Sequence, residues 1–207
     1  MPDDQPAQPH PVPILRAERV YLRPAERSDL PTFVRWFADA EMKRHLGVRA
    51  PFSLAMEEKW FDQQVERQGK DHYMFVICLL DGRPIGSTDL REISIEDGRA
   101  AFGIAVGEKE LWGRGYGTEA LLAICDFGFG QLRLERIELD VYEANARARR
   151  SYEKAGFQVE GTLRHGHYAD GAFMDVVRMS LLRDEWLTQE RPRSWEFSVG
   201  EPHAARS

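Results

Sequence analysis

The sequence has few cysteines, no long apolar run and no excess of basic charge. Cys78 and Cys125 are the 2 cysteines, and their separation and apolar surroundings predict buried free thiols in a reducing compartment instead of a disulfide framework. The longest apolar run, Met74–Leu80, is too short to span a membrane, and the start of the chain lacks the pattern of a signal peptide. We therefore expect a cytoplasmic protein with no membrane partner.

The charge balance argues against nucleic acid as a partner. The formal net charge is -6 at pH 7, whereas general nucleic-acid binding requires a basic face. A content of 43% hydrophobic and 30% charged residues in 207 is ordinary for a globular chain with one sizeable core. We expect a disordered proline-rich lead over residues 1–13, a single domain over residues 14–185, and a partly docked C-terminal tail over residues 186–207 with a frayed end.

The periodicity of apolar residues predicts a mixed arrangement of strands and helices. A helix capped by Ser28 or Asp29 follows the first strand, residues 42–51 are expected to be irregular, and Ser53 caps a second helix with an apolar face of Trp60, Phe61 and Val65. Hairpins dominate the first half of the chain, and β-α-β crossovers follow. Strands are predicted over residues 19–23, 73–80, 84–91, 99–106, 136–142, 157–163 and 173–182, and later helices over 118–129 and 145–155.

Residues 110–120 form a glycine-rich turn between a predicted strand and a predicted helix. Gly113, Gly115 and Gly117 alternate with larger residues. Such a turn leaves backbone N–H groups free at the positive end of the helix dipole, which suits a phosphate. The turn therefore predicts a site for the phosphates of a nucleotide-bearing cofactor. A turn without a ligand is the competing interpretation, because short glycine motifs alone are weak signals.

Two other nucleotide-binding motifs bear comparison with this turn. A Walker loop is excluded because no Gly-Lys-Ser/Thr follows. Residues 115–120 do match G-x-G-x-x-A, and Asp140 ends the next strand, so a protein that binds NAD(P) or FAD is an alternative. That fold expects repeated β-α-β units and a mostly parallel sheet, whereas this loop follows two hairpins.

A second motif, Asn145–Phe157, begins a later helix. Asn145 follows a strand, and Tyr152 lies seven residues on, two turns later on the same helix face. Alone, Tyr152 is best interpreted as a core aromatic with its hydroxyl at the rim. Together, this segment and the glycine turn resemble the CoA-binding motifs of the GNAT superfamily of acyl-CoA-dependent N-acetyltransferases, the turn being similar to its R/Q-x-x-G-x-G/A pyrophosphate motif.

The resemblance runs over roughly residues 16–182 and is strongest to the RimJ/RimL-type branch, which contains the ribosomal-protein alanine acetyltransferases. It implies an α/β (α+β) GNAT fold with a mixed, mostly antiparallel central sheet, splayed strands four and five, and helices on both faces. Trp112 stands where many members have Arg or Gln, although the Rim-type branch has Trp there. Ala101 stands where that branch often has Glu, which leaves a non-catalytic acyl-CoA-binding module as a further alternative.

The resemblance also implies the chemistry. Acetyl-CoA would be the cosubstrate, without a metal, and the acceptor would be a primary amine of a protein N-terminus, polyamine, antibiotic or small metabolite, attacking directly in a ternary complex. A homodimer is compatible with it. Tyr152 would donate a proton to the CoA thiolate, and Asn145 would orient the pantetheine. The cofactor-binding residues would be Ile104, Ala105, Val106, Trp112, Gly113, Arg114, Gly115, Tyr116, Gly117, Thr118, Asn145, Arg150 and Tyr152.

The base that deprotonates the amine is less defined. Glu92 is the first candidate, and Asp140, Glu143, His165 and His167 are others, unless a water chain serves instead. The pair His165 and His167 lacks further ligands at metal-binding spacing, so we expect it to line the acceptor pocket. Arg147 and Arg149 compete with Arg150 for the CoA 3′-phosphate, and at least one of the three is expected to be solvated.

Overall fold

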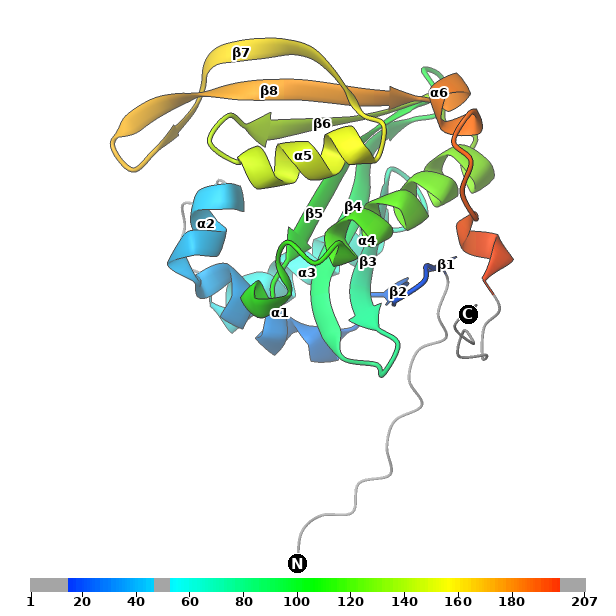
Figure 1. Ribbon diagram of the computed structural model, residues 1–207. Helices are drawn as coiled ribbons and strands as arrows, with labels where there is room; N and C mark the ends of the chain where they lie inside the picture. The colour runs from blue at the N-terminus through cyan, green and yellow to red at the C-terminus, as the bar shows by residue number, and fades with distance from the viewer. Residues whose placement is uncertain (1–14, 47–52, 198–207) are drawn as a thin grey trace, which may run out of the picture.

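The computed structural model describes residues 15–46 and 53–197 (Figure 1). The predicted lead of residues 1–13 and the frayed end lie outside the described residues. An eight-stranded sheet runs in the order β1-β2-β3-β4-β5-β6-β8-β7. Its strands are β1 (Leu15–Arg16), β2 (Val20–Pro24), β3 (His72–Leu79), β4 (Pro84–Ser94), β5 (Arg99–Val106), β6 (Arg136–Tyr142), β7 (Gln158–Ala169) and β8 (Ala172–Leu182). Each predicted strand is present, with ends that differ by a few residues.

The helices occupy both faces of the sheet, as predicted. They are α1 (Leu30–Ala38), α2 (Ala40–Leu46), α3 (Leu54–Arg67), α4 (Tyr116–Asp126), α5 (Ala146–Lys154) and α6 (Arg183–Leu187). The prediction of irregular structure is wrong for Met42–Leu46, which belong to α2, while residues 47–51 lie outside the described residues. The Asp39 carboxylate explains the difference, because it accepts hydrogen bonds from the backbone N–H groups of Glu41 and Met42 at 3.0 and 3.1 Å and so caps the helix.

Helix α3 begins where predicted, since the Ser53 hydroxyl accepts a hydrogen bond from the Met56 N–H at 3.3 Å. Its predicted apolar face is wrong except for Phe61: Trp60 is 36% exposed and Val65 56% exposed. The buried side chains of α3 are instead Glu57, Phe61 and Gln64. Two polar residues on the inner face of a helix indicate that this face borders a polar cavity as well as a core.

The sheet is antiparallel except where β5 meets β6. These two strands pair in parallel over three positions, Arg99 with Arg136, Ala100 with Ile137 and Ala101 with Glu138. Beyond Ala101 and Glu138 the strands diverge, while β5 stays paired with β4 on its other edge. This confirms the mixed, mostly antiparallel sheet with a splay. Because β5 and β6 are the one parallel pair among the described strands, the fold does not support the dinucleotide-binding alternative.

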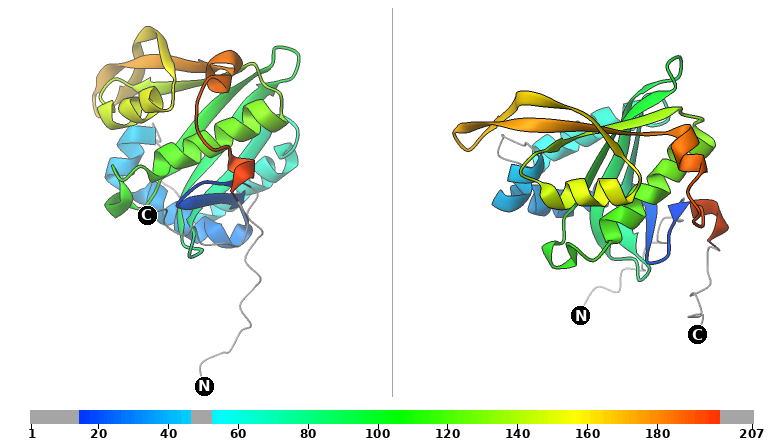
Figure 2. Two further views of the ribbon diagram at one scale, coloured as in Figure 1. Left: turned by 45° about the vertical axis from the view of Figure 1, so that its right-hand side comes forward. Right: turned by 45° about the horizontal axis from the view of Figure 1, so that its top comes forward.

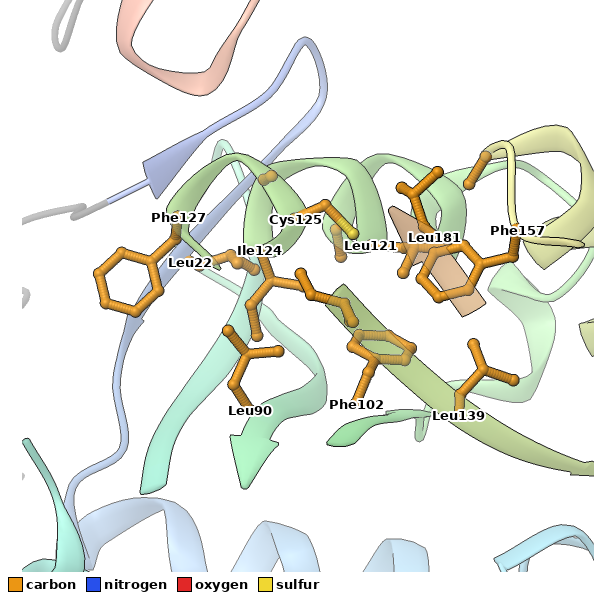
Figure 3. Packing of buried hydrophobic residues seen from close by; sticks show 14 of the residues in the cluster. Leu22, Leu90, Phe102, Leu121, Ile124, Cys125, Phe127, Leu139, Phe157 and Leu181 are labelled. Atoms are coloured by element: carbon orange, nitrogen blue, oxygen red, sulfur yellow. The ribbon is translucent and has the colours of Figure 1, made fainter. Parts of the chain in front are cut away.

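Two cores hold the helices to the sheet. Figure 3 shows Leu121 and Ile124 of α4 pointing toward Leu90 and Phe102 of the sheet, and all four are buried. On the opposite face, a smaller core joins α1 and α3 to β2 and β3. Helices on both faces also line the cavity at the splay between β5 and β6. Cys78 and Cys125 are buried free thiols, as predicted.

The β7–β8 hairpin extends beyond the other strands, as Figure 1 and the right-hand view of Figure 2 show. The chain then returns along the far end of the sheet through α6, which packs on α4 through Trp186 and Asp126. In the described part of the chain, no helix is both long and apolar enough to cross a membrane.

Candidate functional site

The glycine turn has the backbone that its sequence predicts. Gly113 and Gly115 have φ angles of 74° and 89°, in the left-handed region that favours glycine. Gly115 is the N-cap of α4, so the first N–H groups of the helix are unpaired within it. At Gly117 a side chain would approach Val106 of β5, since a Cβ there would lie 3.3 Å from its Cγ2 atom. The turn therefore presents backbone, not side chains, beside the splayed strand.

A cavity of about 900 Å³ lies between the diverging ends of β5 and β6. This volume is in the range of small-molecule sites. At one end the cavity reaches the glycine turn and α5, and at the other it reaches α1, α2, α3, β3 and β4, which we call the acceptor end. Of the predicted cofactor-binding residues, those that line it are Ile104, Ala105, Val106, Trp112, Gly113, Gly115, Gly117, Thr118, Asn145, Arg150 and Tyr152.

Arg114 and Tyr116 are the two predicted cofactor residues outside the lining. Arg114 is exposed, and the Arg19 guanidinium lies over the Tyr116 ring, 4.6 Å from its centre. The half-buried Tyr116 ring also packs against the main core, so neither side chain lines the cavity and only the backbone groups of these two residues are available to a phosphate there.

Trp112 joins the glycine turn to the splayed strand. Its indole N–H donates a hydrogen bond to the Val106 carbonyl at 2.7 Å, and the Arg147 guanidinium lies 3.8 Å from the ring centre. Burial lowers the pKa of Arg147, although an arginine stays charged at any ordinary pH. Arg147 and Arg150 both line the cavity, whereas Arg149 pairs with Glu153 at 2.9 Å on an exposed face, as expected for one of the three.

Tyr152 and Asn145 lie on α5 at the opposite wall. The Tyr152 ring packs edge-on against Phe102, with centroids 6.1 Å apart, and its remaining surface borders the cavity. Burial raises the pKa of Tyr152 to about 12, and the charge of Arg91 opposes this shift. Asn145 caps α5, since its side-chain oxygen accepts from the Ala148 N–H at 3.1 Å. Its amide N–H₂ group stays available to the cavity.

The predicted base does not reach this cavity. Glu92 is exposed on an irregular part of β4, with a φ of 55°, and does not line the cavity. Glu143 does not line it either. Asp140 does, but both its oxygens accept from the Arg178 guanidinium at 2.9 Å. No one of these three groups is a free carboxylate beside β5.

The two histidines of the β7–β8 hairpin also lie outside the cavity lining. His165 stacks on Phe173, with ring centres 5.6 Å apart, and His167 stacks on Tyr142 at 4.3 Å. Tyr142 itself lines the cavity, so His167 contacts the cavity wall through the Tyr142 ring and does not line the cavity. Within residues 15–46 and 53–197, no group of three or more His, Cys, Asp or Glu is placed to hold a metal ion.

Four polar residues at the acceptor end were missed by the sequence interpretation. They are Glu57 of α3, His72 of β3, and Asp89 and Arg91 of β4. His72 is 2% exposed and its Nε2 atom lies 3.1 Å from Asp89 Oδ2, while the Arg91 guanidinium donates to Asp89 Oδ1 at 2.9 Å. Burial raises the pKa of Glu57. The alternation of polar Asp89 and Arg91 with buried Leu90 was the available signal.

Known proteins match this chain in sequence and in structure. The model of the acetyltransferase (GNAT) domain matches residues 19–158. Spermidine N(1)-acetyltransferase of Escherichia coli is 31% identical over 176 residues, which cover 84% of this chain and 92% of that protein. Spermidine N-acetyltransferase from Vibrio cholerae in complex with CoA and spermine has a TM-score of 0.77 at 26% identity, covering 83% of this chain and 100% of that one.

A dodecameric structure of the Vibrio cholerae enzyme has a TM-score of 0.72 at 26% identity and covers 83% of this chain and 98% of that one. These relatives are named for spermidine and not for Rim-type substrates. The chain therefore belongs to the acetyltransferase (GNAT) family and is an acyltransferase of the acetyl-CoA-dependent N-acetyltransferase type.

Proposed function

We propose that this enzyme transfers the acetyl group of acetyl-CoA to a primary amine of a small, cationic, polyamine-like molecule, by direct attack in a ternary complex. The observation that carries the proposal is the continuity of the cavity. It runs from the glycine turn, through the splay of the sheet, to the acceptor end under α1–α3. Both substrates can therefore enter one cavity from opposite faces of the sheet, so no covalent acyl-enzyme is required.

The cofactor half of the cavity fits acetyl-CoA. Backbone N–H groups of residues 113–118 would hold the pyrophosphate at the start of α4, and Arg150 would meet the 3′-phosphate. The unpaired edge of Ile104–Val106 would bind the pantetheine arm, with an N–H near Val106 stabilising the negative charge that develops on the thioester oxygen. The Asn145 amide group would donate to the pantetheine.

Tyr152 would act as the general acid. A phenol held protonated by burial is a proton donor for the thiolate that leaves when the C–S bond breaks. Its position on α5 puts it across the splay from β5, where the thioester would lie. The side chain is fixed by contacts with Phe102 and Phe157, so little ordering is needed at the moment of reaction.

The acceptor end favours a cation with an alkyl chain. Its carboxylates, Glu57 and Asp89, line the cavity together with apolar and aromatic side chains. These side chains are Phe37, Met42, Met56, Trp60 and Met74. Carboxylates attract ammonium groups, and aromatic and thioether side chains cover methylene chains. The named substrates of the relatives, spermidine and spermine, have this chemistry.

A protein N-terminus is the second acceptor class, supported by the Rim-type Trp112 and its neighbouring glycines. An N-terminal peptide has one ammonium group and a polar backbone, whereas a polyamine has several ammonium groups. An aminoglycoside or a free amino acid differs in size from both a polyamine and an N-terminal peptide. A direct comparison of these amines therefore separates the classes.

The test is a thiol-release assay with acetyl-CoA and a panel of spermidine, spermine, an N-terminal alanine peptide, an aminoglycoside and an amino acid. We expect the highest kcat/KM with a polyamine. Preference for the peptide would instead support the Rim-type assignment. Binding of acetyl-CoA without release of CoA for any amine would support the non-catalytic alternative and contradict the proposal.

We also propose a homo-oligomer. Apolar side chains are exposed along the projecting hairpin, including Tyr168 at 44% and Phe173 at 61%. Exposed apolar residues that cluster in this way are typical of a surface that binds another protein chain. One relative is described as dodecameric, and a homodimer is the smallest assembly that covers the hairpin. Light scattering after size-exclusion chromatography tests this, since a monomer at micromolar concentration would contradict it.

A further inference from the structure

The acceptor amine must lose a proton when it forms the new C–N bond, and position 101 offers no group to take it. Ala101 has no titratable side chain, and its cross-strand neighbour on β4 is Arg91. Among the described residues, the carboxylates that line the cavity are Glu57, Asp89 and Asp140. The Asp140 side chain is 43% exposed beside Arg178, whereas that of Asp89 is 21% exposed and Glu57 is buried, which leaves Glu57 and Asp89 as the carboxylates shielded from solvent.

Asp89 lies against the splayed strand. Asp89 and Gly103 are cross-strand neighbours, and a Cβ atom on Gly103 would lie 2.3 Å from Asp89 Oδ1 and 2.3 Å from Arg91 Nη1. The absence of a side chain at position 103 therefore makes room for the Asp89 carboxylate directly beside β5. The next residues of that strand, 104–106, are those to which we assign the pantetheine arm, with the thioester oxygen near Val106. Glu57 projects from α3 and has no such contact with β5.

Two donors fix the orientation of this carboxylate. Arg91 Nη1 donates to both oxygens, at 2.9 Å to Oδ1 and 3.2 Å to Oδ2, and the ring Nε2 of His72 lies 3.1 Å from Oδ2. A carboxylate only accepts hydrogen bonds, so His72 carries its hydrogen on Nε2. A hydrogen-bonded carboxylate on a rigid strand pair is oriented before the substrate arrives, which is what a general base requires.

The other nitrogen of His72 has no partner. Nδ1 is buried and, among the described residues, accepts no hydrogen bond. A buried acceptor without a partner costs free energy, so packing alone does not favour a histidine at this position. Further charged groups on the elements around His72 are the Arg67–Asp71 pair, which precedes β3, and Glu57 of α3, which lines the same cavity.

We propose that Asp89 is the general base of this enzyme and that His72 is the residue that positions it. The inference rests on the proposed amine acetylation. The neutral amine nitrogen attacks the thioester carbon, its proton passes to an Asp89 oxygen as the C–N bond forms, and the C–S bond breaks as Tyr152 protonates the sulfur. Water in the open cavity then returns the proton from Asp89 to Tyr152, so the proton balance closes. The carboxylate absent from position 101 of β5 is thus supplied by the neighbouring strand.

The experiment compares Asp89→Asn with Asp97→Asn, which removes a carboxylate from the exposed Asp97–Arg99 pair outside the cavity. With the best amine of the panel, Asp89→Asn should lower kcat by about 10² to 10⁴-fold and change the Kd of acetyl-CoA less than about threefold, while Asp97→Asn keeps wild-type kcat. Asp89→Glu, which keeps the charge, should retain far more activity than Asp89→Asn.

Formate rescue distinguishes catalysis from folding. Added sodium formate should restore part of the kcat of Asp89→Ala in a saturable manner, whereas it should not affect the wild type. His72→Gln keeps an N–H donor and should lower kcat less than His72→Phe, with equal Kd for acetyl-CoA. Wild-type kcat in Asp89→Asn, or an equal loss in Glu92→Gln, would overturn the assignment. If the wild type acetylates no amine, the proposed function fails and this inference fails with it.

Discussion

The Trp112 indole N–H donates a hydrogen bond to the carbonyl oxygen of Val106, at 2.7 Å. The bond ties the last residue of the splayed strand β5 to a residue of the glycine turn six positions later. Residues that would hold the pantetheine and residues that would hold the pyrophosphate are therefore fixed relative to each other. The Arg147 guanidinium also stacks on the Trp112 ring, with its carbon 3.8 Å from the ring centre.

Trp112→Phe should weaken CoA binding. The substitution keeps the ring under Arg147 and removes the hydrogen bond, which is worth about 1 kcal/mol, or about a fivefold rise in Kd. Isothermal titration calorimetry with CoA measures it. Trp112→Leu, which also removes the cation–π contact, should raise Kd further. A Kd for Trp112→Phe equal to that of the wild type would mean that the bond does not order the turn.

Tyr152→Phe should lower kcat about 10²-fold or more and leave the Kd of acetyl-CoA nearly unchanged, because only the hydroxyl is removed from a packed ring. Burial raises the pKa of Tyr152 to about 12, so the phenol stays protonated well beyond the pKa of about 10 of an ordinary tyrosine. The kcat of the wild type should accordingly show no loss from phenol ionisation up to about pH 10. An unchanged kcat in Tyr152→Phe would remove this residue from the mechanism.

Much of the fold could be predicted because its signals are local. Alternating apolar residues indicate β6 with the ends that the structure has, and Ser53 and Asn145 each cap the helix that follows. The signal for the glycine turn is also local, because the positive φ angles at Gly113 and Gly115 favour glycine at these two positions. The cofactor half of the cavity is built from such segments, so most of its residues were named from the sequence.

The acceptor half could not be predicted in the same way because it is assembled across strands. Asp89 becomes important only through its register opposite Gly103 and its contact with His72, which is 17 residues away. Glu92, by contrast, follows the cavity-lining Arg91 directly in sequence but is exposed at an irregularity of β4. A shift of one or a few residues in a strand decides which carboxylate enters the cavity.

Gly103→Ala should impair acetylation while keeping the fold. The new Cβ would come within 2.3 Å of Asp89 Oδ1 and Arg91 Nη1, and both are ends of side chains that can move aside. We therefore expect a small change in Tm and a loss of kcat of about tenfold or more, because a displaced base no longer meets the amine. Gly161→Ala is the matched control, since a Cβ there has no neighbour within 4 Å. Equal kcat values for the two variants would contradict the role of this glycine.

Acid stability should depend on Glu160 of β7. Hydrogen bonds from Arg136, and then from Ser180, lower the pKa of Glu160 from 4.5 to about 2. A carboxylate with a lowered pKa in the folded state contributes stability above its unfolded pKa, and this contribution is lost as the pH falls from 4.5 to about 2. The side chain is 38% exposed, so the contribution should stay below about 1 kcal/mol. Urea unfolding of Glu160→Gln between these pH values should show a weaker pH dependence than the wild type.

Asp126 should be the main attachment of the C-terminal segment to the core. This carboxylate is 1% exposed and accepts hydrogen bonds from Trp186, from the Arg191 guanidinium and from the Ser194 N–H, the shortest being 2.6 Å. Asp126→Asn removes the charge and leaves Arg191 partly buried without its partner, which typically costs about 3 kcal/mol. The free energy of unfolding in urea should fall by about that amount.

The control for this substitution is Glu190→Gln, an exposed carboxylate in the same segment, which should change the free energy of unfolding by less than about 0.5 kcal/mol. Limited proteolysis gives a second, local measurement. If Asp126 holds the segment, cleavage near Arg191 and Arg193 should become faster in Asp126→Asn at temperatures where the sheet is still folded. Equal cleavage rates in the two variants would mean that Trp186 and its aromatic neighbours, Phe129 and Trp195, hold the segment without the charge.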